Sequence, residues 1–170
     1  MTMARPYEGA TPEQLQHHLV REFLGIHTLF RRELANMLRF VTELMTRPEL
    51  LAGPQSRMYV QQLAQATYHY TQLLHFHHHG ETGMLFPALR EKGLDDPVIE
   101  RLNAEHDEIA ALIDQLDGTL HSAAVFHPQV VDSDLRRLSD ALRNHLAYEE
   151  EHVCPLLTRF SQWPMGRYQA

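Results

Sequence analysis

The sequence predicts an all-α protein, folded as an up-down-up-down bundle of four helices. Apolar residues recur at helical spacing along nearly the whole chain, and glycine and proline mark the joints. No segment alternates between apolar and polar residues for long, so no β-sheet is expected. Four amphipathic segments with modest connections favour antiparallel neighbours around one core. We expect the bundle over residues 12–160, with tails at 1–11 and 161–170.

The first helix is expected to begin at a capping-box pattern. Thr11 is the expected N-cap, Pro12 takes the first helical position, and Gln14 lies at the third. The Arg-Pro pair at 47–48 ends this helix, because a residue that precedes proline avoids the α region.

The second helix should begin near Gln55. Gly80, Gly83 and Pro87 predict a kink or a break before that proline, with a short turn at 88–93. The inward residues expected on this helix are Leu63, Ala66, Tyr70, Leu73 and Leu74.

The third and fourth helices have weaker boundaries. Asp96 is the expected N-cap of the third, with Pro97 at its first position. Gly118 either ends this helix or is followed by one or two further turns. The fourth starts within 128–134 and runs toward Pro155.

The composition narrows the function classes. Of 170 residues, 44% are hydrophobic and 22% charged, which is typical of a globular protein. No apolar run reaches transmembrane length and no secretory signal is recognised. The single cysteine, Cys154, excludes an internal disulfide and is expected to be a small buried hydrophobe. We therefore expect a cytoplasmic protein. A net charge of -7 without a basic cluster argues against nucleic-acid or membrane partners.

Thirteen histidines are unusual for this length, and several replace core residues on the helical stripes. Each predicted helix places one on its buried face, and two helices add a glutamate four residues later. A lone stripe histidine is usually a satisfied core residue, but burying two carboxylates without partners costs several kcal/mol, by order of magnitude. Bound metal is the simplest compensation. The residues are His27, His77, His106 and His145, with Glu81 and Glu149.

The chain also repeats a motif. His77-x-x-x-Glu81 and His145-x-x-x-Glu149 are each followed, six residues after the glutamate, by a proline. Each motif lies in the second helix of a pair whose first helix offers a lone inward histidine. This pseudo-twofold pattern favours two metals bridged by carboxylates, roughly 3.5–4 Å apart. A ferritin-like site needs two Glu-x-x-His motifs, and only Glu149-x-x-His152 fits.

These residues resemble the hemerythrin-like, or HHE cation-binding, domain family. The matching pieces are HTLFRREL from His27, HHHGETGMLFP from His77, EHDEI around His106 and HLAYEEEHVCP from His145. The resemblance implies a four-helix bundle with a non-haem di-iron centre. Its two iron ions would be joined by carboxylate and oxo or hydroxo bridges, and would bind dioxygen, hydrogen peroxide or nitric oxide.

One position departs from the family pattern. The oxygen carriers of the family have a His-x-x-x-His pair on the third helix, and here Leu102 stands at its first position. We expect His78 to replace the missing imidazole, because it lies only about 60° from Glu81 around the helix. The expected metal ligands are therefore His27, His77, His78, Glu81, His106, His145 and Glu149.

Some choices stay open at this level. Glu150 matches the spacing used by the oxygen carriers, whereas the internal repeat favours Glu149. Core packing is the preferred role for Tyr70, and the alternatives are a hydrogen-bond donor to a metal ligand or a phenolate ligand. His75 and His79 lie on the opposite helix face and are expected to be exposed.

The changed ligand set bears on function. Because Leu102 cannot ligate, catalase-like breakdown of peroxide or handling of nitric oxide is preferred over simple dioxygen carriage. One alternative is a non-catalytic sensor of oxygen, iron or nitric oxide. Another is a bundle that uses metal, such as zinc, for stability alone.

Overall fold

The structure, a computed structural model, describes residues 10–122 and 126–164, and these contain helices and connections but no strand. The all-α prediction is confirmed. Of the two predicted tails, residues 1–9 and 165–170 lie outside the described part. The long helices are α1 (His18–Thr46), α3 (Ser56–Gly80), α5 (Asp96–Ser122) and α6 (Pro128–Leu157). The short elements are a 3₁₀ turn (Gln14–Gln16), α2 (Glu49–Ala52), a π-turn (Glu81–Leu85) and α4 (Phe86–Arg90).

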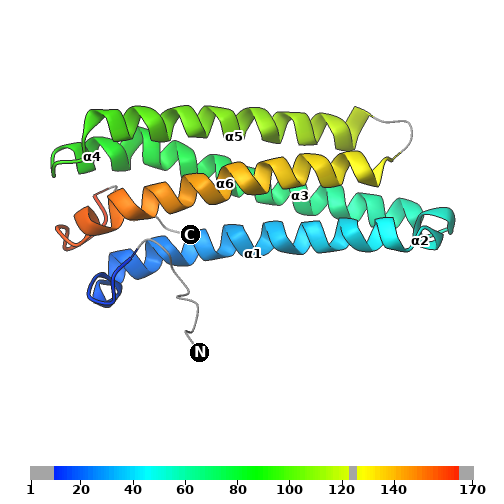
Figure 1. Cartoon of the computed structure of the whole chain (residues 1–170), viewed down its shortest axis with the longest axis horizontal. Helices are drawn as coiled ribbons and strands as arrows, with labels where there is room; N and C mark the ends of the chain where they lie inside the picture. The colour runs from blue at the N-terminus through cyan, green and yellow to red at the C-terminus, as the bar shows by residue number, and fades with distance from the viewer. Residues whose placement is uncertain (1–9, 123–125, 165–170) are drawn as a thin grey trace.

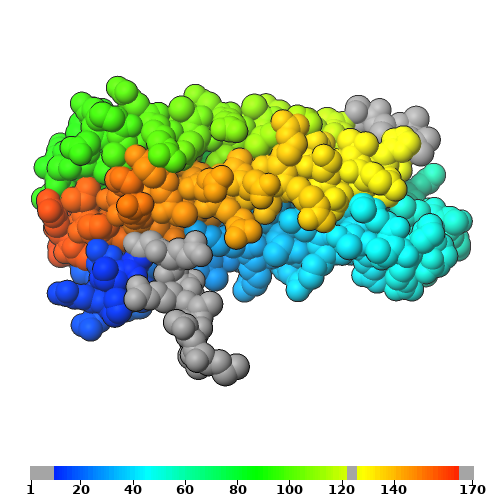
Figure 2. Space-filling view, viewed as in Figure 1, coloured from blue at the N-terminus to red at the C-terminus, as the bar shows by residue number. Residues whose placement is uncertain are grey.

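The four long helices lie side by side along the long axis of the molecule, and the chain runs back and forth between its two ends (Figure 1). Helix α1 contacts α3 and α6, and α5 contacts the same two helices. In the space-filling view, the side chains of α6 lie against those of α1 on one side and those of α5 on the other (Figure 2). None of the helices in the described ranges is both long and apolar enough to cross a membrane.

The core is divided into two apolar clusters along the bundle. One contains Phe23 and Phe86, and the other contains Phe30 and Leu74. On α1 and α5 the change from one cluster to the other falls at His27 and His106. On α6 it falls between Leu146 and Val153, around Glu149, and along α3 and the π-turn it falls between Leu74 and Leu85. A polar layer is therefore enclosed between two dry apolar ones.

The predicted capping box forms, but it does not begin the long helix. The Thr11 amide donates to Gln14 Oε1 (2.9 Å), and the Gln14 amide donates to Thr11 Oγ1 (3.3 Å). These bonds cap only the 3₁₀ turn, because His17 is extended, with φ -79° and ψ 129°. Helix α1 starts after it, at His18, so the predicted start was too early.

At the third long helix, the start differs from expectation and the end agrees with one of the two alternatives. Asp96 was predicted as an N-cap, but the first backbone bonds of α5 run to the carbonyl of Asp95. The carboxylate of Asp96 instead pairs with Arg90 (2.7 Å). Of the two ends considered for α5, the later one is confirmed, because the helix passes Gly118 and continues for one more turn, to Ser122. Spacing along a sequence sets a helix end only to within a turn, because neighbouring residues compete for the cap.

The predicted break before Pro87 is a π-turn. The chain widens over Glu81–Leu85, and the Phe86 amide bonds to the carbonyl of Glu81. Pro87 has no amide hydrogen, and in a regular α-helix its ring would clash with the carbonyl four residues earlier. The wider π-turn makes room for the proline ring. The expected turn at 88–93 is shorter than predicted, because α4 extends to Arg90.

Two residues predicted to be inward on the second helix are not buried. Ala66 is exposed, and 38% of Leu73 is exposed. Both line a pocket between α1 and α3. The apolar stripe of α3 is therefore wider than the part of the helix that packs into the core. Leu63, Tyr70 and Leu74 are buried as expected.

Candidate metal centre

All seven predicted ligands lie in the polar layer between the two apolar clusters. Six have an exposed fraction of 7% or less, and the side chain of His77 is 11% exposed. Every long helix contributes, so the layer is closed on all sides by packed helices. The contributors are His27 on α1, His77 and His78 on α3, Glu81 on the π-turn, His106 on α5, and His145 and Glu149 on α6.

Their ligand atoms form two groups, and within each group the atoms lie within 4.8 Å of one another. Glu81 belongs to both groups. Its Oε1 lies 2.8 Å from His77 Nε2, and its Oε2 lies 3.4 Å from His106 Nε2. One carboxylate thus faces both centres, as a bridging ligand does. The first group is His27, His77, Glu81 and Glu149; the second is His78, Glu81, His106 and His145.

The protein itself does not satisfy this layer. Both carboxylate oxygens of Glu81 and of Glu149 lack hydrogen-bond partners. Nε2 of His27, His77 and His78 lacks them too. An unpartnered buried polar atom costs about 1–3 kcal/mol, and more for a charged group. Imidazole nitrogens and carboxylate oxygens are the donors that iron, zinc and manganese accept, so the two groups fit metal cations.

Glu150, the alternative to Glu149, lies outside both groups. Its Oε1 accepts from Nδ1 of His27 (2.9 Å) and from the guanidinium of Arg31 (2.7 Å). The geometry therefore divides the two neighbours between roles. Glu149 belongs to the first group of candidate ligand atoms, whereas Glu150 holds the ring of His27 from its other side.

The second group has orienting contacts of the same kind. Glu105 Oε2 accepts from Nδ1 of His145 (3.0 Å), and Arg101 donates to the other oxygen (2.8 Å). The hydroxyl of Thr82 donates to Asn103, so it accepts from Nδ1 of His106 (3.0 Å). Our sequence reasoning missed these residues. The one available signal was the acid directly before His106 in EHDEI.

These outer contacts assign the tautomers of three ligand histidines. His27, His106 and His145 each commit the Nδ1 proton to an oxygen, so each ring presents an unprotonated Nε2 inward. The Nε2 atoms of His106 and His145 lie only 3.2 Å apart. Two lone pairs that face each other at this distance repel, and a shared cation converts that repulsion into coordination.

The two inward carboxylates differ in protonation. Burial works against the charged form of Glu81, but attraction to the nearby imidazoles of His77, His106 and His78 holds its pKa well below the ordinary range. Burial, together with the negative charges of Glu81 and Glu150, raises the pKa of Glu149 well above its ordinary range. The raised pKa favours the protonated form of Glu149, so a cation at this position would compete with a proton.

Burial also lowers the pKa values of three imidazoles in this layer. The pKa of His27 falls from 6.5 to about 4, and those of His78 and His106 fall as well, in each case chiefly through burial. These rings are neutral at pH 7 and present lone pairs. Neutral imidazole is the form that binds metal.

The metal-free protein is expected to lose stability as the pH falls below about 6.5. The unfolded chain protonates its histidines near 6.5, whereas folded His27, His78 and His106 stay neutral to lower pH. Their contribution is complete above the unfolded pKa and is lost as the pH falls toward the folded pKa. Each proton taken up on unfolding contributes about 1.4 kcal/mol per pH unit.

Glu149 opposes this trend, because its raised pKa makes its contribution fall as the pH rises above the unfolded value. Three histidines outweigh this one glutamate. Urea unfolding of chelator-treated protein at pH 7.5, 6.5 and 5.5 measures the slope. Stability that is constant or rises toward pH 5.5 contradicts the burial of neutral imidazoles.

Removing Glu150 tests the orienting contact behind His27. Glu150→Ala is expected to weaken metal affinity about 10- to 100-fold, because outer partners of ligand histidines have effects of this size. Glu151→Ala is the matched control, since Glu151 is the next residue and is exposed. Competition with a chromophoric chelator measures both. Equal affinities for the two variants would refute the orienting role.

The remaining candidates lie outside the two groups. His79 is exposed as predicted, whereas His75 is half-buried. Burial raises the pKa of Tyr70, which disfavours a phenolate ligand. Leu102 is fully buried in the cluster that contains Phe23. Cys154 is buried and free, and burial raises its pKa to about 12, so it is an unreactive thiol.

Comparison with known proteins agrees with this geometry. The family model described as "Hemerythrin HHE cation binding domain" matches residues 18–157. No curated protein and no solved structure gave a match. The matched region runs from the start of α1 to the end of α6 and includes every residue of the two metal-binding groups. The chain therefore belongs to the hemerythrin HHE cation-binding domain family.

Proposed function

We propose that this chain is a non-haem di-iron protein that binds or turns over dioxygen, hydrogen peroxide or nitric oxide. Within this range, breakdown of peroxide or handling of nitric oxide is preferred over simple dioxygen carriage. The observation that carries the proposal is Glu81, a buried carboxylate whose two unpartnered oxygens face two separate groups of ligand atoms. The alternating direction of the four long helices in Figure 1 supports an up-down-up-down bundle around this centre.

Iron suits the donor set. Five imidazoles and two carboxylates provide the mixed nitrogen and oxygen ligation that iron accepts, and structural zinc sites usually contain cysteine. When bound, a pair of iron ions supplies the redox chemistry that no protein side chain of this layer offers. Sets of four protein donors leave coordination positions for a small ligand, as other non-haem iron sites do.

The two groups are chemically unequal. His27 and His77 share the first group with two carboxylates, whereas the second has three imidazoles and only Glu81. More anionic ligation favours the higher oxidation state, so the first position is the better site for ferric iron. The two ions would therefore differ in redox potential.

The protein residues around the centre restrict the ligand to something small. The layer lies between two apolar clusters, so few water molecules compete for the open positions. Leu102 fills the place where the oxygen carriers have a histidine, and its apolar side chain belongs to one of those clusters. The imidazole count is kept by His78, whose ring stacks on that of His106 with centroids 3.9 Å apart.

Metal analysis of protein purified in air tests the centre. We expect two iron ions per chain, by analogy with other two-metal sites, and a near-ultraviolet absorption that azide perturbs. A colourless protein that holds zinc, with no response to azide, would contradict the di-iron proposal.

Oxygen evolution from hydrogen peroxide tests the preferred activity. The reaction converts two molecules of hydrogen peroxide into one of dioxygen and two of water, so an oxygen electrode follows it directly. The iron-loaded protein should turn over, and the chelator-treated protein should not. A stable, reversible dioxygen adduct without peroxide turnover would instead favour carriage.

A further inference from the structure

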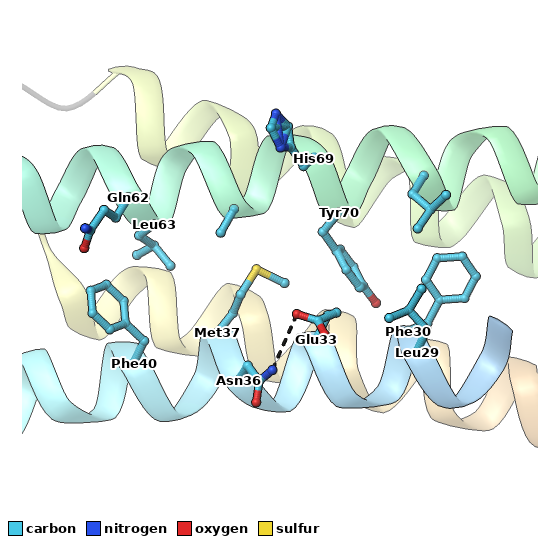
Figure 3. Close-up of a pocket in the computed structure, with 12 residues that line it drawn as sticks. Leu29, Phe30, Glu33, Asn36, Met37, Phe40, Gln62, Leu63, His69 and Tyr70 are labelled. Carbon is cyan, nitrogen blue, oxygen red and sulfur yellow. Dashed lines mark hydrogen bonds between the residues drawn. The ribbon is translucent and has the colours of Figure 1, made fainter. Parts of the chain in front are cut away.

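A pocket of about 480 Å³ lies between α1 and α3 (Figure 3). Its volume falls within the range of small-molecule sites, which are mostly apolar with a few placed polar groups. It accounts for the exposed Ala66 and Leu73, which line it. Its apolar wall is formed by Phe30, Met37, Phe40 and Leu63.

Tyr70 places one polar atom in this wall. The residue is only 6% exposed, and its hydroxyl is buried without a hydrogen-bond partner. In Figure 3 its ring reaches from α3 across the pocket toward α1. A buried hydroxyl nearly always has a partner in a folded protein, so this one calls for a ligand that supplies it. Burial raises the pKa of Tyr70, which keeps the hydroxyl a donor.

The pocket is close to the metal centre but separate from it. The ring of Phe30 meets Tyr70 edge-on, with centroids 5.9 Å apart, and lies 5.0 Å from the ring of His77. Phe30 is fully buried, and its ring lies between those of Tyr70 and His77. A molecule in the pocket therefore binds to protein alone.

The wall chemistry selects a neutral aromatic ligand. Phe30, Phe40 and the thioether of Met37 favour contact with an aromatic ring. Glu33 lines the same pocket, with its carboxylate held by Arg32 (2.9 Å). A carboxylate in the wall disfavours anions such as fatty acids, and it can accept from a ligand hydroxyl.

We propose that this pocket binds a small phenol, with the ring on the apolar wall and the phenolic oxygen hydrogen-bonded to Tyr70. The site needs no metal, so its test is independent of the di-iron proposal. Phenol and toluene are the probes, because they are similar in shape and differ at the hydroxyl. Isothermal titration with the full-length protein measures both affinities.

Two variants sharpen the test. Tyr70→Phe removes only an unpartnered hydroxyl, and the ratio of phenol to toluene affinity should fall about five-fold. Ala66→Phe fills the pocket from an exposed position and should abolish binding of both probes. Gln61→Phe is the matched control on the same helix, because Gln61 is exposed and does not line the pocket. It should bind both probes as the wild type does.

Several outcomes overturn the proposal. One is wild-type protein that shows no saturable binding of phenol. Another is an affinity ratio that Tyr70→Phe leaves unchanged. A third is a dimer, seen by analytical ultracentrifugation, that Ala66→Phe dissociates, because a second copy of the chain then occupies the pocket. Unchanged helical circular dichroism and iron content in each variant separate these results from misfolding.

Discussion

Replacing Glu81 by glutamine is expected to remove both metal ions from the protein. Glu81 is the one residue shared by the two ligand groups, and its two oxygens face different histidines, His77 and His106. A neutral amide keeps the shape of the side chain but has a single oxygen, and it lacks the charge that balances two cations. Each group is then left with three donors and no bridge, so both sites weaken together.

Iron per chain, measured by mass spectrometry after loading in air, is the direct readout. We expect wild-type protein to hold about two ions and Glu81→Gln close to none. Glu100→Gln is the control, because Glu100 is exposed on α5 and belongs to neither ligand group. Circular dichroism should show both variants folded, since the substitution buries no new charge. Retention of one ion by Glu81→Gln would show that the bridge is unnecessary for one group.

The inward residues of the centre could be predicted because helical periodicity fixes direction. His27 lies four residues after Phe23 and three before Phe30, so its side chain must enter the core with theirs. The same argument placed His106 and His145. Figure 1 shows the long helices that bring these stripes together. Directions along single helices therefore predicted which residues meet, with no knowledge of distances.

The outer contacts could not be predicted in this way. The carboxylate of Glu105 on α5 pairs with His145 on α6. The guanidinium of Arg31 on α1 pairs with Glu150, also on α6. Such contacts depend on the rotation and the offset of one helix against its neighbour, which a sequence does not display. The choice between Glu149 and Glu150 had the same difficulty, because both are fully buried and only the packed structure gives them different partners.

The π-turn also lay beyond the sequence argument. Gly83 and Pro87 predicted an interruption but not its form. A break would have ended α3 and released Glu81 from the helix axis. The widened turn instead keeps Glu81 in line with α3 while Thr82 turns to His106 on α5. Two consecutive residues can thus serve one site from different sides.

Replacing His78 by alanine is expected to remove one of the two metal ions. His78 and His77 are consecutive on α3, but they contribute to different groups. His78→Ala leaves the second group with Glu81, His106 and His145. The first group keeps all four of its ligands. Iron content should therefore fall from about two ions to about one per chain, because losing a ligand weakens a site far more than losing an outer contact, which costs 10- to 100-fold.

His77→Ala provides the complementary result, because it should empty the first group and spare the second. His79→Ala is the matched control from the same run of histidines, and it should keep both ions because His79 is exposed. The absorption spectra of the two single-ion variants should differ, since the surviving groups have different donors. If His78→Ala retains both ions and the wild-type spectrum, His78 does not replace the imidazole absent at Leu102. The second ion would then be held by Glu81, His106 and His145 alone. The ligand set would still differ from that of the oxygen carriers, because it would contain one imidazole fewer.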